Sequence, residues 1–232
     1  CPYNGYFSPW GIKHLADGPE GEYLSDRLTD EAIKLIREND GTPFFLNFWD
    51  YLVHTPLQAK TRDVEYFQAK AERLGLDKIP ALEEGEFFPC EHKKNMRVTR
   101  RRIQSNPIYA AMVKAMDDNL GRLLAALEET GQAQNTMVIF TSDNGGLATA
   151  EGSPTTNQPL QEGKGWMYDG GVREPLIVRW PEQIAAGTIC ETPVSSPDFY
   201  PTILAAAGLP ARPEQHVDGE SILPLLTQSG EL

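Results

Sequence analysis

The chain has 232 residues but few cysteines and no long apolar run. Its three cysteines, Cys1, Cys90 and Cys190, are widely separated and form no CxxC metal or redox pattern. An odd number leaves at least one thiol unpaired within the chain, so cysteine usage does not identify the redox compartment. Because no run of about 18 apolar residues occurs, the sequence predicts no membrane span. The chain also begins without an initiating Met or a signal-peptide pattern, and we therefore expect it to be a piece of a longer protein.

Basic residues are also fewer than acidic ones, 21 against 33, which gives a net charge of -12. Affinity for a phosphate backbone comes from clustered Lys and Arg, so a nucleic-acid partner is not expected. The densest basic run, His92 to Arg102, lies beside the acidic segment Glu83 to Glu91. A solvated face next to those acids is the favoured interpretation of this run, and an anion-binding surface is the alternative.

The remaining composition is that of an ordinary globular protein, with 40% hydrophobic and 23% charged residues. We expect one domain over residues 1–232, because a chain of this length can bury a sizeable core. Residues 61–105 are mixed and charged, and prolines interrupt them, so they predict an excursion over the surface.

Three helices are predicted in the first part of the chain. Apolar residues recur at helical spacing from Leu24 to Ile36, and this helix should end near Asn39 to Gly41. A second helix is expected over Val64 to Leu74. The third begins at Asn106-Pro107, with Asn as the N-cap and Pro at the first helical position, and Gly131 marks its left-handed end.

Short apolar runs predict three strands, at Pro43 to Trp49, Met137 to Thr141 and Pro175 to Trp180. A helix followed at once by the Met137 strand is typical of a parallel crossover. Ser195 to Ala207 predicts a short helix that stops at Gly208, and Asp218 to Leu226 predicts a turn followed by one helical turn.

Polar residues that could do chemistry lie at or near the ends of these strands. Asp143 and Asn144 follow the Met137 strand, His54 follows the Pro43 strand, and Lys164 lies in the glycine-rich loop before the third strand. Strand ends of an α/β sheet share one edge, and oxygen ligands suit Ca²⁺ or Mg²⁺, whereas His and Lys suit a tetrahedral oxyanion. Each residue also has a plainer explanation: a capping turn for Asp143-Asn144, a satisfied loop histidine for His54 and a solvated lysine for Lys164.

Taken together, these segments resemble the C-terminal part of the catalytic domain of a type I sulfatase, a formylglycine-dependent, arylsulfatase-like family of the alkaline phosphatase superfamily. The resemblance covers nearly the whole chain and rests on an ordered set of blocks: GPEGEYLSDRLTDEAIKLI (Gly18 to Ile36), PFFLNFWDYLVHTPLQAK (Pro43 to Lys60), YAAMVKAMDDNLGRLLAALEETG (Tyr109 to Gly131), MVIFTSDNGG (Met137 to Gly146), GKGWMYDGGVREPLIVRWP (Gly163 to Pro181), SSPDFYPTILAAAGL (Ser195 to Leu209) and DGESILPLL (Asp218 to Leu226).

The resemblance implies an α/β fold of three layers, α/β/α, around a mostly parallel sheet of the alkaline phosphatase type, incomplete at both ends. It implies that Asp143 and Asn144 are two ligands of a Ca²⁺ ion, with Mg²⁺ the less favoured cation. By the same resemblance, His54 contacts the sulfate ester as a proton donor or stabiliser of the leaving oxygen, and Lys164 binds the sulfate oxygens. Asp169 is expected to orient its loop, and Arg173 to pair with a carboxylate.

The family's C/S-x-P-x-R segment, whose Cys or Ser becomes formylglycine, does not occur in this sequence. We therefore expect the formylglycine in a missing upstream segment, and we expect the isolated chain to be inactive and to be completed by the N-terminal portion of the same enzyme. The full-length parent is predicted to be a sulfuric ester hydrolase that acts on a sulfated small molecule or carbohydrate, in the periplasm or outside the cell. The alternatives are a phosphodiesterase or phosphonate monoester hydrolase of the same superfamily, and a non-catalytic sulfatase-like binding domain.

Overall fold

The computed structural model describes residues 4–215 and 218–231. The backbone forms two compact units. The first contains residues 4–130 and 141–175, and the second contains residues 131–140 together with the described part of 176–232. Within the described residues, no helix combines the length and the apolar character that a membrane crossing requires.

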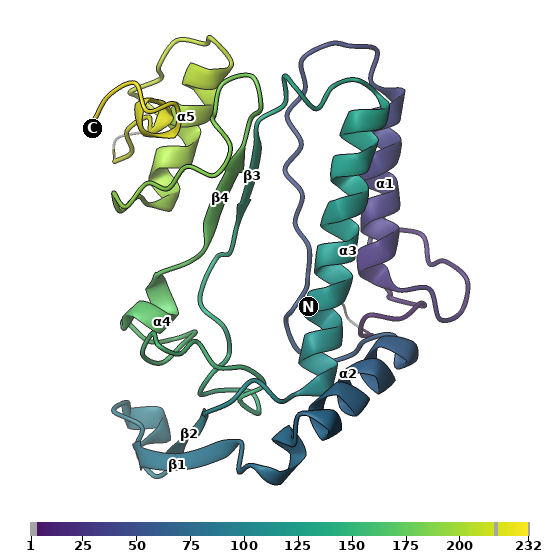
Figure 1. Ribbon diagram of the computed structural model, residues 1–232, viewed down its shortest axis with the longest axis vertical. Helices are drawn as coiled ribbons and strands as arrows, with labels where there is room; N and C mark the ends of the chain where they lie inside the picture. The colour runs from purple at the N-terminus through teal and green to yellow at the C-terminus, as the bar shows by residue number, and fades with distance from the viewer. Residues whose placement is uncertain (1–3, 216–217, 232) are drawn as a thin grey trace. The chain divides into compact units, whose positions relative to one another are not determined.

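The first unit is built on two long helices that lie side by side, α1 (Leu24–Glu38) and α3 (Pro107–Glu129) (Figure 1). A shorter helix, α2 (Thr61–Arg73), contacts α3. The apolar stripes of α1 and α3 meet in a core that also takes up the irregular N-terminal segment, and its buried members are Tyr6, Trp10, Tyr23, Leu24, Met112 and Ala115. All three predicted helices of this unit are therefore confirmed.

The ends of α3 show why this helix could be predicted from local signals. The Asn106 side chain accepts hydrogen bonds from the backbone N–H groups of Ile108 and Tyr109, at 3.0 and 3.1 Å. These two bonds satisfy N–H groups that have no partner within the helix. Beyond the last turn, Gly131 has φ of 72°, the left-handed conformation that glycine adopts without a steric cost.

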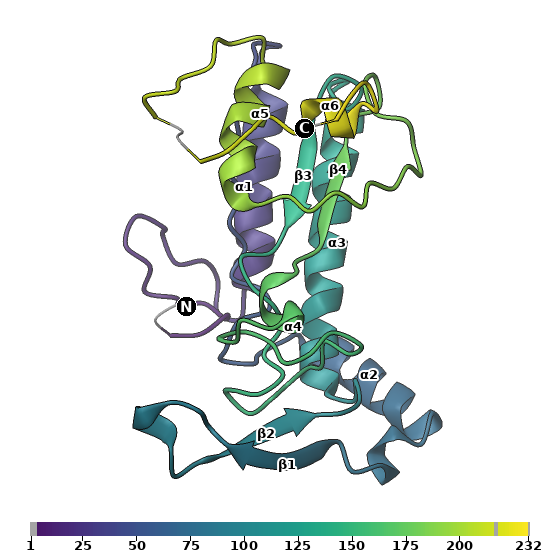
Figure 2. The ribbon, with the colours of Figure 1, turned by 90° about the vertical axis from the view of Figure 1, so that its left-hand side faces the viewer.

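The predicted excursion contains α2, two short 3₁₀ helices, η1 (Leu76–Lys78) and η2 (Glu91–Lys93), and a hairpin. In the hairpin, β1 (Leu82–Phe87) pairs antiparallel with β2 (Arg97–Arg101) (Figure 2). The acidic strand faces the basic one, and ion pairs join them: Arg97 to Glu84, Arg100 to Glu86 and Arg102 to Glu83. The basic run is thus an ion-paired, largely solvated face, as the charge pattern indicated.

The predicted strand at Pro43 to Trp49 is wrong. These residues are extended but belong to no strand, and Figure 1 draws them as an unpaired trace. Phe45 and Trp49 are 70% and 79% exposed. An apolar run becomes a strand only where another strand takes up its backbone N–H and C=O groups, and no described segment pairs with this one.

The second unit contains a two-stranded sheet of β3 (Val138–Thr141) and β4 (Leu176–Arg179). It also contains the 3₁₀ turn η3 (Ser196–Asp198), which leads into α5 (Phe199–Ala206), and the single turn α6 (Leu223–Leu226). These elements confirm the predictions for this part of the chain. The described strands form two sheets of two strands each, so the class is α/β, while three layers around a mostly parallel sheet stay a prediction.

Candidate active site

Three segments of the first unit carry the candidate residues. His54 lies in the turn at residues 51–56, Asp143 and Asn144 follow β3, and Lys164 lies in the loop before the short helix α4 (Asp169–Val172). Asp143 is exposed, and the other three are partly buried.

Tyr6 holds the turn that carries His54. Its side chain is completely buried, and its hydroxyl group lies 2.6 Å from the carbonyl oxygen of Tyr51 and 3.0 Å from that of His54. The backbone N–H of His54 donates to the same Tyr51 carbonyl at 3.0 Å. Burial raises the pKa of Tyr6, so its hydroxyl group keeps its proton and remains a donor to this turn. Nothing in the composition of the N-terminal segment pointed to this role.

The structure brings His54 and Lys164 together, although they are 110 positions apart. Lys164 Nζ lies 2.9 Å from His54 Nε2, and His54 Nδ1 lies 2.9 Å from the carbonyl oxygen of Thr55. A carbonyl oxygen can only accept, so these partners assign the proton of a neutral imidazole to Nδ1 and leave Nε2 to accept from the ammonium group. The pair can present one positive charge and one mobile proton to an anionic ester.

Close backbone contacts fix the Lys164 loop against the turn after β3. The N–H of Lys164 donates to the carbonyl of Gly146 at 3.2 Å, and the N–H of Gly145 donates to the carbonyl of Gly171 at 3.3 Å. A Cβ atom at Gly145 would lie 1.8 Å from the oxygen of Gly170, and one at Gly163 would lie 2.2 Å from the oxygen of Gly146. Glycine is therefore required where these backbones cross, and the crossing places Lys164 beside the Asp143-Asn144 turn.

Asp169 performs the predicted orienting role. Its carboxylate accepts from the backbone N–H of Gln161 at 2.7 Å and from that of Gly170 at 3.0 Å. Arg173 behaves differently from the prediction, because it is exposed and forms no ion pair with a carboxylate of the described residues. An arginine in water has its charge solvated and needs no such partner.

Glu174 is a candidate residue that sequence reasoning missed. Its Oε1 atom is buried and has no hydrogen-bond partner among the described residues, and burial, followed by the nearby charge of Asp143, raises the pKa of its carboxyl group. A carboxylate oxygen without a partner, near the charge of Asp143, is the kind of oxygen donor that a hard cation uses. Within residues 4–215 and 218–231, however, no three His, Cys, Asp or Glu side chains gather as a metal-binding group.

A second missed residue is Glu162, two positions before Lys164. Its carboxylate, with a side chain only 3% exposed, binds the guanidinium group of Arg100 on β2, with Nε to Oε1 at 2.9 Å. The amide of Asn157 donates to the carbonyl oxygens of both Glu162 and Gly146. The hairpin is thereby connected to the loop that holds Lys164.

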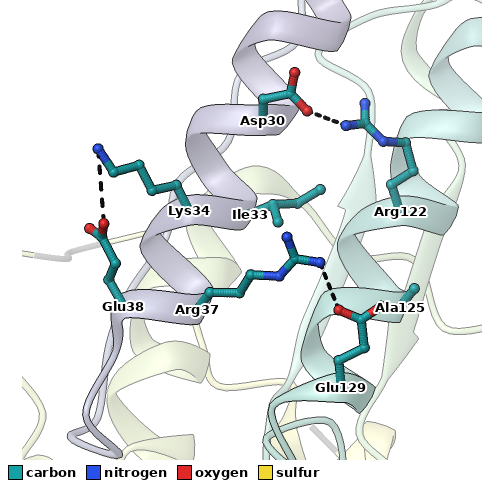
Figure 3. Close-up of a pocket in the computed structure, with 8 residues that line it drawn as sticks. All are labelled: Asp30, Ile33, Lys34, Arg37, Glu38, Arg122, Ala125 and Glu129. Carbon is teal, nitrogen blue, oxygen red and sulfur yellow. Dashed lines mark hydrogen bonds and ion pairs between the residues drawn. The ribbon is translucent and has the colours of Figure 1, made fainter.

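A groove between α1 and α3 is separate from these residues. Figure 3 shows its two ion pairs between the helices, Asp30 with Arg122 and Arg37 with Glu129. Both arginines already have a carboxylate partner, and exposed pairs of this kind contribute little to stability. The polar residues of this groove therefore make ordinary contacts between two helices.

The fold is similar to that of known proteins. A crystal structure of Ps i-CgsB in complex with k-i-k-neocarrahexaose matches with a TM-score of 0.70 and 32% identity, over 93% of this chain and 41% of that one. The α/β class follows from this likeness together with the described elements.

The family itself follows from the sequence match. The model of the Sulfatase family matches residues 1–209, and the chain therefore belongs to the sulfatase family. A sulfatase of Formosa agariphila is 32% identical over 97% of this chain and 36% of its own length. Mouse steryl-sulfatase (Mus musculus) is 38% identical over 88% of this chain and 27% of its own length. The chain thus spans about a third of the curated relatives that it matches.

Proposed function

We propose that the protein to which this chain belongs hydrolyses sulfate esters. The observation that carries the proposal is the contact between Lys164 Nζ and His54 Nε2 at 2.9 Å, in a chain of the sulfatase family. A fixed ammonium group next to an imidazole supplies both charge for an anionic sulfate and a proton for its leaving oxygen.

In this proposal, Lys164 binds the sulfate oxygens. Its ammonium group has three donors, so it can contact sulfate and keep its hydrogen bond to His54. His54, held by its bond to the Thr55 carbonyl, is the group that transfers a proton through Nε2 to the departing ester oxygen. Nε2 receives this proton from the ammonium group that points at it, so Lys164 holds the sulfate as a cation before the transfer and is a neutral amine once the ester oxygen has taken the proton.

Asp143 and Asn144 are proposed as two ligands of a Ca²⁺ ion. Their oxygens suit a hard cation, and the orphaned carboxylate oxygen of Glu174 supports a local demand for positive charge. When bound, the cation would draw negative charge from the sulfate oxygens. We expect the remaining ligands and the formylglycine nucleophile to come from the upstream part of the protein. The complete fold should have three layers around one larger sheet.

The proposed substrate class is a sulfated carbohydrate. Support comes from the oligosaccharide bound by Ps i-CgsB, with which this chain shares 32% identity and its fold. A periplasmic or extracellular location is part of the same proposal, since polymeric carbohydrates of this kind are met outside the cell.

The test measures turnover of an aryl sulfate and of a matched aryl phosphodiester by the full-length protein. Lys164→Ala and His54→Ala should each lower kcat/KM for the sulfate by about 10²- to 10⁴-fold, the usual contribution of a positioned acid or base. Lys34→Ala and His92→Ala, at exposed positions, are the matched controls and should leave it unchanged. Chelation should abolish turnover, and Ca²⁺ should restore it in the parent more readily than in Asp143→Ala.

Two results would contradict the proposal. Preferential turnover of the phosphodiester would replace sulfate ester hydrolysis with the phosphoesterase alternative. Binding of sulfated ligands without cleavage of any ester would identify a non-catalytic domain.

A further inference from the structure

Three aromatic side chains lie in a row, two from the loop that follows Lys164 and one from the hairpin segment. Phe88 and Trp166 are stacked, with ring centroids 6.0 Å apart and planes inclined by 26°. Tyr168 continues the row at 6.2 Å from Trp166, with planes inclined by 34°. Trp166, the middle ring, is two positions from Lys164 in the sequence, so the loop that carries the residue proposed to bind sulfate also carries this ring.

The row is held from both sides. The indole N–H of Trp166 donates to the hydroxyl group of the buried Thr149 at 2.8 Å, and its backbone N–H donates to Gly163 at 3.0 Å. Phe88 comes from the hairpin, where its N–H donates to Met96 at 2.9 Å. Because these bonds fix the backbone and the ring plane, little conformational entropy is lost when a ligand covers the rings.

The surface is open and has a cation at one end. Tyr168 is 48% exposed, and Phe88 and Trp166 are partly exposed. Lys93 Nζ lies 5.1 Å from the Phe88 ring centroid. The chain as a whole has a net charge of -12, so a cation over an aromatic ring at this position is a local feature.

We propose that Phe88, Trp166 and Tyr168, with Lys93, form a subsite for a second sugar of an anionic oligosaccharide whose sulfate ester lies at Lys164. The proposal rests on the proposed function and deepens it. The apolar face of a sugar ring can pack on Tyr168, the exposed end of the row, and Lys93, beside Phe88 at the other end, can contact a sulfate or carboxylate that the oligosaccharide carries. The enzyme should therefore prefer a chain of sugars to a single aryl group.

The same row could instead only attach the hairpin to the Lys164 loop, or bind an apolar protein surface. Attachment alone would affect every substrate equally, because loss of the contact would disturb Lys164 itself. A protein-binding role would leave all substrates unaffected. Both outcomes differ from that of a sugar subsite, which acts only on substrates long enough to reach it.

The experiment compares 4-nitrophenyl sulfate with sulfated tetrasaccharides prepared from carrageenan, chondroitin sulfate and heparin, using the full-length protein. In Tyr168→Ala, KM for the best tetrasaccharide should rise about tenfold, while kcat/KM for 4-nitrophenyl sulfate changes less than about twofold. Lys93→Gln should raise the same KM and weaken its dependence on salt. Tyr66→Ala is the matched control, since Tyr66 is an exposed tyrosine beside another ring, Phe67, on α2.

Equal losses on the aryl sulfate and the tetrasaccharide would overturn the subsite in favour of a structural role, and so would no loss on either. Trp166→Phe keeps a ring but removes the bond to Thr149, so it should weaken tetrasaccharide binding less than Tyr168→Ala if the rings carry the interaction. The proposal would also be overturned if Trp166→Phe lost more activity than Tyr168→Ala on both the aryl sulfate and the tetrasaccharide. Failure of the proposed function is distinguishable, because the unsubstituted protein would then cleave no sulfate ester at all.

Discussion

Tyr6 and Asp50 show at the residue scale how the position of His54 depends on side chains in the core. The Tyr6 hydroxyl group spans the two carbonyls at either end of the His54 turn. Asp50 precedes that turn and accepts from the Ser25 hydroxyl at 2.5 Å and from the Leu52 N–H at 3.1 Å. Both residues bind the 51–54 segment to the core, and their loss should be visible separately in stability and in turnover.

Tyr6→Phe removes only the hydroxyl group and leaves the ring in the core. The Tyr51 and His54 carbonyls lose the hydrogen bond from this hydroxyl, although Tyr51 keeps that from the His54 N–H, so the free energy of unfolding should fall by about 1–2 kcal/mol. Because the turn then loosens, kcat should fall several-fold while KM changes little. Tyr109→Phe is the matched control, since Tyr109 also has a partly buried hydroxyl group, bonded to Thr155. Unchanged kcat in Tyr6→Phe would show that this bond does not position His54.

Asp50→Asn tests the effect of burying a carboxylate. Burial is the main reason that the pKa of Asp50 is raised, and hydrogen bonds from Ser25 and Leu52 only partly offset it. The folded state therefore holds this proton more tightly than the unfolded state, whose pKa is about 3.9. The contribution of protonated Asp50 to the free energy of unfolding is greatest below about pH 3.9, and it is lost as the pH rises through the pKa that Asp50 has in the folded state.

Urea unfolding across a pH series checks this sign. The unfolding free energy of the parent should fall relative to that of Asp50→Asn as pH rises from about 4 towards neutrality. Asp40→Asn, at an exposed position, should follow the parent across the series. If the parent instead gained stability relative to Asp50→Asn as the pH rises, the raised pKa of Asp50 would be contradicted.

Among the elements, the hairpin and the Lys164 loop form one connected piece through Arg100. This guanidinium group binds Glu86 within the hairpin and Glu162 in the loop, and both hydrogen bonds raise its pKa. In return, Arg100 is the main cause that lowers the pKa of Glu86 to about 2. Glu86 therefore stays ionised at neutral pH, and water screens the two carboxylates to different extents.

Glu162→Gln and Glu86→Gln make a matched pair. The Glu162 side chain is 3% exposed and that of Glu86 is 61% exposed. Loss of the buried charge should cost about 2 kcal/mol, because hydrogen bonds to charged groups in dry surroundings are stronger, whereas loss of the exposed one should cost under about 1 kcal/mol. Guanidinium denaturation at neutral pH measures both. Equal losses would mean that the hairpin is held by its own strands rather than by the loop.

At the scale of the whole molecule, the feature with the largest consequence is the apolar segment from Pro43 to Trp49. The side chains of Phe44, Phe45 and Trp49 are exposed, and the backbone of the segment has no partner strand among the described residues. Extended apolar segments with free backbone groups associate with one another. We therefore expect this exposed segment to associate with another polypeptide segment.

The 232 residues produced alone should associate or precipitate. Phe45→Ser combined with Trp49→Ser should raise the fraction of monomer, measured by size-exclusion chromatography with light scattering. Met167→Ser is the control, because Met167 is a highly exposed apolar residue outside that segment. A monomeric parent chain that melts in one sharp transition would contradict this expectation.

The helices and the glycine-bounded turns were predictable because their causes are local. Asn106 and Gly131 act on backbone groups within a few residues, and the stripe of α3 repeats within the helix itself. The strand at Pro43 to Trp49 was not predictable in the same way. Its hydrogen bonds must come from elsewhere, and the same apolar residues remain extended and unpaired without them.

The sequence by itself determined the chemistry that the chain has available, since Asp143, Asn144, His54 and Lys164 are recognisable from their motifs and their place near the predicted strands. Only the tertiary structure decided that His54 and Lys164 touch, that Tyr6 holds the His54 turn and that a buried oxygen of Glu174 has no hydrogen-bond partner among the described residues. The physical reason is how far apart in the sequence the contacting residues lie. A helix closes its hydrogen bonds over four residues, whereas these contacts join segments tens to more than a hundred positions apart, and folding alone brings them together.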